Sequence, residues 1–157
     1  MLWRLTKDTP FQTPDWRGNE RRFVLHRHQD SAGPHLDLRI ETPAYLLGWR
    51  VDGDALSCAC LAMEKGPHPL RWLDEHGAME RVDAGIYQLL ERTERSRTFL
   101  MKGREGVWRL RAEAEPLFPL SVYGAIREVI AQHGVRPADA AKLVEDGILA
   151  RSRAVQR

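Results

Sequence analysis

The strongest constraint on the fold is an alternation of polar and apolar residues, with a period of two, between Arg22 and Ala112. Successive side chains of a β-strand point to opposite faces, so this pattern is typical of strands that bury one face. Seven segments follow it: RRFVLHRH, HLDLRIE, YLLGWRV, ALSCACLAM, GIYQLLER, RTFLMKG and GVWRLRA. Glycine, proline, aspartate or serine residues separate them. Seven short strands at close spacing predict a small antiparallel β barrel, with a sandwich as the alternative.

The sequence on either side of this β region has a different character. The first twenty residues contain two prolines and predict an irregular arm that lies over the barrel. Apolar residues recur every three or four positions over 120–130 and again after Pro137, which predicts a C-terminal pair of amphipathic helices. We therefore expect a mainly β fold with flanking helices. The barrel domain with its arm would span 1–115, and a helical extension packed on it would span 116–157.

Length and composition favour a soluble, single-domain protein. The 157 residues suffice for one hydrophobic core, and no apolar run approaches the roughly 18 residues of a membrane span. The N-terminus shows no signal-peptide pattern. Cys58 and Cys60 lie two positions apart on one predicted strand, where a disulfide between them would be strained. We expect a cytoplasmic protein with reduced cysteines and no membrane partner.

The net charge of +2 is too small to attract nucleic acid to the whole surface, so such a partner would need a local basic face. One cluster of cations surrounds KGREG, which predicts a hairpin turn at 103–106. The cluster comprises Arg92, Arg95, Arg97, Lys102 and Arg104. A solvated hairpin is the preferred interpretation, and a contact with a nucleic-acid backbone is the alternative.

The most informative polar residues lie in HRHQDSAGPHLDLRIE, residues 26–41. In its second strand, His35, Asp37 and Arg39 share one face. The glycine and proline before that strand predict a connection that folds it back and puts His28 near His35. Two imidazoles and a carboxylate suit manganese, with zinc or iron as alternatives. The guanidinium of Arg39 suits a phosphate held on that metal, so this face outlines a phosphoryl site.

These residues also have a plainer interpretation. A strand whose polar face lies in water would show the same alternation, and that alternative stays open on the residues alone. His26 competes with His28 for one role, so we interpret it as a surface residue or as a support for the ligands. We interpret His76, in the polar stretch LDEHGAMER, and His133, at a helix end, as surface and capping residues.

Several motifs in order resemble one known family. FVLHRH followed by HLDLRIE resembles the FVxxKHxxxxxHxDxRxE signature of the 3′-phosphoesterase domain of bacterial DNA ligase D, which also occurs as free-standing proteins. EKGPHPLRW resembles the family's EDHPLxY, DAGIY resembles its PEGxYG, and the tryptophan of LLGWRV matches a further position. The matches run from residue 22 to about residue 111. The resemblance implies a small β barrel with flanking helices.

The resemblance also implies an activity. Studied members remove a 3′ ribonucleoside and then a 3′ phosphate from DNA primer ends, with a divalent metal that is usually manganese. The chain would then be a DNA-repair hydrolase whose substrate is a DNA 3′ end, and a DNA ligase or polymerase of end-joining repair would act in trans. The implied metal ligands are His28, His35 and Asp37, and the implied catalytic and substrate-binding residues are Arg39, His68 and Trp72.

Some positions depart from the family pattern. Trp72 replaces a tyrosine and lacks its hydroxyl, and VDGDA lacks the lysine of the family's VPKGP. One extra residue separates His28 from His35, and residues 64–67 lengthen the approach to His68. The candidates for an N-terminal arginine and acidic residue are Arg17 and Glu20. These departures keep two alternatives open: a non-catalytic module that binds nucleic acid or protein, and a phosphoesterase with another substrate.

Overall fold

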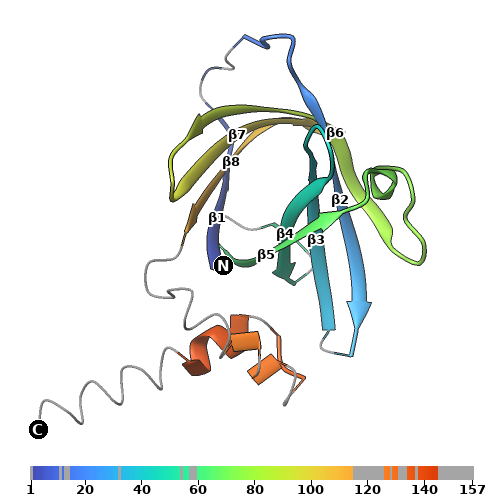
Figure 1. Ribbon diagram of the computed structural model, residues 1–157, viewed down its shortest axis with the longest axis vertical. Coiled ribbons are helices and arrows are strands. Elements are labelled where there is room, and N and C mark those ends of the chain that lie inside the picture. Colours follow the sequence, from blue (N-terminus) through green and yellow to red (C-terminus); the bar gives the residue numbers. More distant parts are fainter. Residues whose placement is uncertain are drawn as a thin grey trace, which may run out of the picture.

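The computed structural model describes residues 2–10, 12, 15–31, 33–53, 55–56, 60–114, 126–127, 129–130, 134–136 and 138–144. Eight antiparallel strands close a barrel in the order β1–β5–β4–β3–β2–β6–β7–β8, because β1 pairs with both β5 and β8 (Figure 1). The strands are β1 (Leu2–Asp8), β2 (Arg21–Asp30), β3 (Gly33–Glu41), β4 (Leu46–Asp52), β5 (Cys60–His68), β6 (Glu80–Arg92), β7 (Ser96–Gly103) and β8 (Gly106–Ala114). The predicted barrel is confirmed, and so is the hairpin turn between β7 and β8.

The N-terminal segment corrects one prediction. We predicted an irregular arm for the first twenty residues, but Leu2–Asp8 forms β1 and completes the barrel. Trp3 and Leu5 alternate with exposed residues and are only 2% and 1% exposed, as in any half-buried strand. The Trp3 indole Nε1 donates a hydrogen bond to Glu64 Oε2 on β5 at 2.9 Å. Because β1 pairs on both sides, it removes the two open edges that β5 and β8 would otherwise expose.

The barrel interior is filled by apolar side chains. On β3, Leu36, Leu38 and Ile40 point inward, as their alternation predicted. The same core includes Trp3, Phe23, Trp49, Phe99, Met101 and Leu110. Eight strands enclose a space that side chains of this size can fill. Chemistry in this fold therefore belongs to the outer face of the barrel or to its two mouths.

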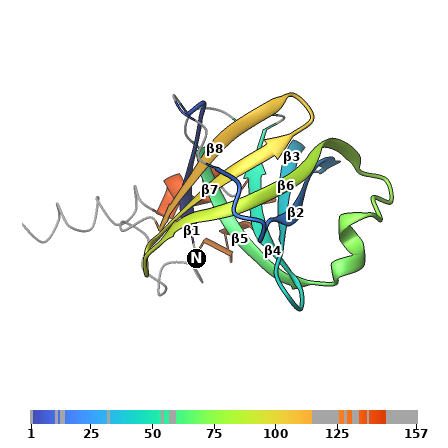
Figure 2. The same cartoon turned by 90° about the horizontal axis from the view of Figure 1, so that it is seen from above.

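The connection between β5 and β6 covers part of the outer face. It carries the single-turn 3-10 helix η1 (Leu70–Leu73) and lies outside the ring of strands (Figure 2). Leu73 of η1 is 3% exposed and packs with Val24 of β2 and Leu46 of β4. This small apolar contact holds the connection against the barrel wall, next to the polar residues of β2 and β3.

The C-terminal extension contacts the neighbouring part of the outer face. Met63 of β5 packs with Ile126, Ala140 and Ala141 in a second apolar cluster. The backbone is helical at 126–127, 129–130 and 138–144, but the rest of the predicted pair lies outside the described residues, so the pair is not confirmed. Cys58 and His133 also lie outside them. Within the described ranges, no helix has the length and apolar character needed to cross a bilayer.

We expect Trp3→Ala to lower the free energy of unfolding by about 3–5 kcal/mol, because it empties a large volume beside Trp49 and removes the hydrogen bond to Glu64. Urea denaturation followed by circular dichroism measures this change. Thr6→Ala, on the same strand, is the control and should shift stability by about 0.5 kcal/mol or less. A similar small effect of both variants would contradict the role of β1 in barrel closure.

Candidate functional site

The register of β2 and β3 brings the predicted site residues together on the outer face. The cross-strand pairs are His28 with His35, His26 with Asp37, and Val24 with Arg39. The His28 and His35 rings meet nearly edge to face, with centroids 5.1 Å apart. The prediction that these two histidines are neighbours is confirmed. The pairing continues without a shift as far as Asp30 with Gly33, so His28 stays in register. The extra residue between the two histidines is therefore accommodated in the turn that follows this last pair.

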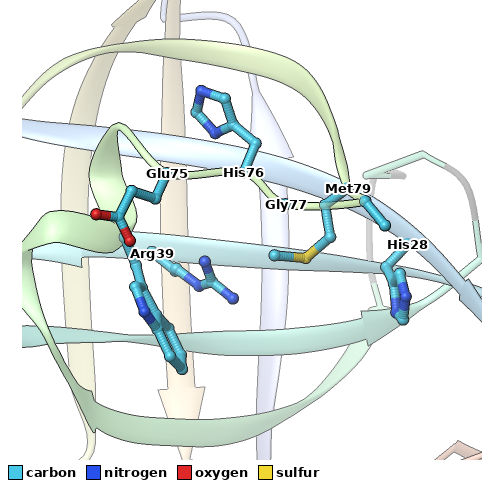
Figure 3. A pocket seen from close by; sticks show the side chains of 8 residues that line it. His28, Arg39, Glu75, His76, Gly77 and Met79 are labelled. Carbon is cyan, nitrogen blue, oxygen red and sulfur yellow. The ribbon is translucent and has the colours of Figure 1, made fainter.

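A pocket of about 400 Å³ lies between this face and the connection that follows β5. Its walls come from two strands and from the connection: His28, Arg39, Trp72, Glu75, His76, Gly77, Ala78 and Met79. Figure 3 shows the guanidinium of Arg39 beneath the segment that carries His76, with His28 beyond the side chain of Met79. The Glu75 carboxylate forms an ion pair with Arg71, 3.4 Å apart. The pocket is large enough for part of a small ligand, in the usual range for such sites.

Arg39 places a positive charge in this pocket although it is only 7% exposed. Its guanidinium carbon lies over the Trp72 ring, 4.9 Å from the centroid. Burial lowers the pKa of Arg39, and the neighbouring Asp37 carboxylate opposes that shift. A guanidinium stays protonated in proteins, so the group remains a cation. A buried, stacked arginine that faces a pocket suits an anion, and its planar fork suits a phosphate.

A β-bulge turns His68 toward the same site. Leu46 pairs with His68 but Gly48 pairs with Lys65, so β5 carries one residue more than β4 over this interval. Bulges of this kind change the face to which a side chain points. The His68 ring stacks on Trp72, with centroids 4.9 Å apart and an interplanar angle of 26°. The long approach noted in the sequence is therefore accommodated by the bulge. Burial, and then the charge of Arg39, lower the pKa of His68.

Lys65 joins the site, and sequence reasoning missed it. It lies opposite Gly48, which itself lies opposite Arg39, so the glycine separates the two cations. A Cβ on Gly48 would meet the Leu38 carbonyl oxygen at 1.8 Å, so only glycine fits this position. Burial lowers the pKa of Lys65, and the charges of Arg50 and Arg127 lower it further. Spacing alone could not show that this lysine stands near Arg39.

A second bulge brings Arg81 beside His26. Leu25 pairs with Asp83 but His26 pairs with Arg81, so β6 has one additional residue at this point. Arg81 contacts the Nε2 atom of His76. His76 lines the pocket, and its Nδ1 atom lies 2.6 Å from His26 Nε2. His76 is therefore a half-buried residue in contact with His26, rather than a surface residue without a role in the site. The packing of the β5–β6 connection on the barrel, which no local pattern encodes, draws it inward.

His26 is fully buried and holds Arg39 in place, so it is not a surface residue but a supporting one. Arg39 Nη1 donates a hydrogen bond to His26 Nδ1 at 3.2 Å, since an arginine can only donate. A neutral His26 then carries its proton on Nε2, the atom that lies 2.6 Å from His76 Nδ1. Burial lowers the pKa of His26 to about 4, and the charges of Arg39 and His76 add to this effect. His26 therefore stays neutral at physiological pH.

The predicted metal ligands offer suitable atoms. His35 Nε2 and Asp37 Oδ2 are 3.3 Å apart. Two donors that each lie about 2.1 Å from one ion are separated by about 3.0–3.4 Å, so this pair fits a divalent cation in chemistry and spacing. Across the described ranges, however, no three histidine, cysteine, aspartate or glutamate side chains converge closely enough to enclose an ion. The contribution of His28 as a third ligand is therefore a proposal.

The structure brings the predicted site residues close together, but of these His35, Asp37 and His68 are not among the residues that line the pocket. His28, Arg39 and Trp72 line the pocket, and His68 stacks on Trp72. Arg17 and Glu20, the candidates for an N-terminal arginine and acidic residue, do not line it. The backbone N–H of Arg17 donates a hydrogen bond to Gln88 Oε1 on β6 instead, at 2.9 Å. No family model matches this chain, and no curated protein matches it either.

We expect the metal-free protein to lose stability as the pH falls from 6.5 to 4. The unfolded chain protonates His26 near pH 6.5, whereas the folded chain does so only near pH 4, so the unfolded state binds more protons in this window. The lowered pKa of His26 therefore contributes about 3 kcal/mol to the free energy of unfolding above pH 6.5. This contribution is lost on acidification to pH 4. Urea denaturation at pH 7.5, 5.5 and 4.5 measures it.

The comparison with His26→Asn isolates this effect, because an asparagine amide does not titrate. The variant should be less stable at pH 7.5 but should lose less stability than the wild type between pH 6.5 and 4. The lowered pKa of Asp8, which a hydrogen bond from Arg109 causes, contributes only below about pH 4. Parallel pH profiles for the two proteins would contradict a buried, neutral His26.

Proposed function

We propose that this protein is a divalent-metal-dependent phosphoesterase that acts on the 3′ ends of DNA in repair and removes a 3′ phosphate or a 3′ ribonucleotide. One observation carries the proposal: Arg39, a buried cation held by His26 and Trp72, faces a pocket beside His28. This combination of a fixed guanidinium and imidazoles suits a phosphoryl group. The resemblance to the ligase D 3′-phosphoesterase domain supplies the DNA 3′ end as the substrate.

The charges around the pocket support an anionic substrate. Burial is the main cause of the lowered pKa of His68 and of Lys65. The charges of Arg39 and then Lys65 lower the pKa of His68 further, and that of Arg50 does so for Lys65, so several positive groups act on the same small region. Asp37 is the carboxylate that opposes these shifts. A bound phosphate would compensate this excess of positive charge. Lys65 would in this way replace the lysine that VDGDA lacks.

Several side chains of this protein would act on the phosphate, each in a different way. Arg39 would hold two oxygens through its fork, and Trp72 would keep the guanidinium in its orientation. His28, His35 and Asp37 would hold the cation. The bound cation would supply Lewis acidity and a water of lowered pKa. His68 is neutral in the free protein, and the negative charge of a bound phosphate would raise its pKa, so it could then carry a proton for the leaving oxygen.

The experiment is an end-trimming assay with Mn²⁺ on primer-template DNA that ends in a 3′ phosphate or a single ribonucleotide. We expect cleavage by the wild type and none by His35→Ala. Arg39→Lys keeps the charge but loses the fork, and it should lower kcat/KM by about 10²–10³-fold. Arg111→Gln, on the exposed outer face of β8, is the matched control and should cleave normally.

The outcomes separate the proposal from its alternatives. If His35→Ala still cleaves, the proposed metal site on this face is contradicted. Hydrolysis of a small phosphodiester but not of DNA ends would indicate a phosphoesterase with another substrate. Wild-type protein that is folded, binds Mn²⁺ and cleaves neither substrate would contradict catalysis.

The alternative function is a non-catalytic module that binds nucleic acid or protein. One observation favours it: no three ligand side chains converge in the described part of the chain. Calorimetric titration with Mn²⁺ tests this point without activity. One ion bound per chain, reduced in both His35→Ala and Asp37→Ala, would support the phosphoesterase. Nucleic-acid binding without any Mn²⁺ uptake would support the binding module.

We expect His68 to give different apparent pKa values in the two kinetic profiles. The profile of kcat/KM reports the free protein, in which burial and Arg39 hold the pKa of His68 below 6.5. The profile of kcat reports the complex, in which the phosphate charge should raise that pKa. Rates measured from pH 5 to 8.5 at saturating Mn²⁺ give both values. The difference should vanish in His68→Gln, and equal values in the wild type would contradict a contact between His68 and the phosphate.

A further inference from the structure

A second pocket, of about 360 Å³, lies at one mouth of the barrel and is lined by residues of the turn between β3 and β4 and of β6 and β7. Its lining combines aromatic rings with cations: Tyr45, Tyr87, Phe99, Arg21, Arg92 and Arg97. Among the residues that the structure describes, no carboxylate lines it. The nearest one on β3, Glu41, is turned away and accepts a hydrogen bond from the Arg22 backbone N–H at 3.2 Å. This lining suits a ligand that is both flat and negatively charged.

Two of the apolar side chains here are exposed to an unusual degree. Tyr45 is 41% exposed and Leu89 is 39% exposed, and among the other large apolar side chains of the described residues only Leu143 is more exposed than these two. The backbone of Tyr45 is nevertheless held in place, since Thr42 Oγ1 donates to its carbonyl at 2.7 Å and the Thr42 backbone N–H does so at 2.9 Å. An exposed ring that projects from such a turn at a pocket edge is a surface on which another ring can stack.

Two of the three cations of this pocket, Arg21 and Arg92, are available to a ligand. Within the described residues, neither Arg21 nor Arg92 forms an ion pair, and both are exposed. Arg97 lies over the Trp3 ring, 5.1 Å from the centroid, and is 4.0 Å from a Glu64 oxygen. Unpaired arginines beside exposed aromatic rings bind the backbone and bases of single-stranded nucleic acid.

The position of the pocket relates it to the phosphoryl site. Ile40 and Thr42, which line it, follow directly after Arg39. Three residues of extended strand span about 10 Å, so the next nucleotides of a strand whose 3′ end lies at Arg39 can reach the mouth. We infer that this pocket binds a nucleotide upstream of the 3′ terminus, with its base stacked on Tyr45 and its phosphate on Arg21 and Arg92. The inference rests on the proposed function for the direction of the strand.

The test measures binding without metal, so that hydrolysis plays no part. A fluorescein-labelled single-stranded hexanucleotide that ends in a 3′ phosphate is compared, by anisotropy, with an abasic oligomer of the same charge. The wild type should bind the abasic oligomer about tenfold more weakly. Tyr45→Ala should weaken binding of the hexanucleotide about tenfold and remove its advantage over the abasic oligomer, while Tyr45→Phe retains it. Arg92→Gln should weaken binding of both oligomers, and Arg111→Gln should change neither.

Other outcomes would overturn the inference. Equal affinity of the wild type for the two oligomers would show that charge alone binds. A mononucleotide that competes as well as the hexanucleotide would indicate a free nucleotide rather than a strand, and equal competition by oligoglutamate would indicate an acidic peptide. The two proposals fail separately. If Tyr45→Ala changes neither cleavage nor binding, only the proposed base pocket is contradicted. If the protein binds in a base-dependent way but does not cleave, only the proposed phosphoesterase activity is contradicted.

Discussion

The filled interior of the barrel determines where this protein can do chemistry. Trp3, Trp49, Phe99 and their neighbours occupy the space inside eight strands, so that face of each strand is committed to packing. Away from the two mouths of the barrel, polar side chains that bind or react can therefore lie only on the outer face of each strand. On β2 and β3 the outer residues are the histidines, Asp37 and Arg39, and their pairing is fixed because a slip of one residue would put them into the core.

Two bulges then adapt the regular wall to the site. An antiparallel ladder with a strict period of two would turn either Lys65 or His68 away from the outer face, and the extra residue on β5 allows both to face it. The bulge on β6 does the same for Arg81, which stands beside His26 although Leu25 pairs with Asp83. Both irregularities lie close to the pocket, because His68 stacks on Trp72 and Arg81 contacts His76, and both Trp72 and His76 line it.

Most of the strands, and the hairpin of β2 and β3, could be predicted from the sequence, because the alternation of polar and apolar residues is a local pattern. The faces of β3 and the pairing of His28 with His35 followed from that signal and from the connection between the strands. What escaped prediction depends on contacts that are distant in sequence. The barrel closes only when Trp3 reaches Trp49 and Glu64, and a short segment of seven residues did not reveal this. His76 enters the site because Leu73 anchors its connection.

The energetics of Arg39 support the proposal that the pocket binds an anion. Burying a guanidinium costs free energy unless a partner compensates it, and the partner that its Nη1 meets is the neutral ring of His26. A neutral acceptor satisfies one hydrogen bond without cancelling the charge. Had stability alone been favoured, a carboxylate at position 26 would have paired with Arg39. A histidine that stays neutral keeps the guanidinium oriented while its positive charge remains available to a ligand, which is the condition that tight binding of a phosphate requires.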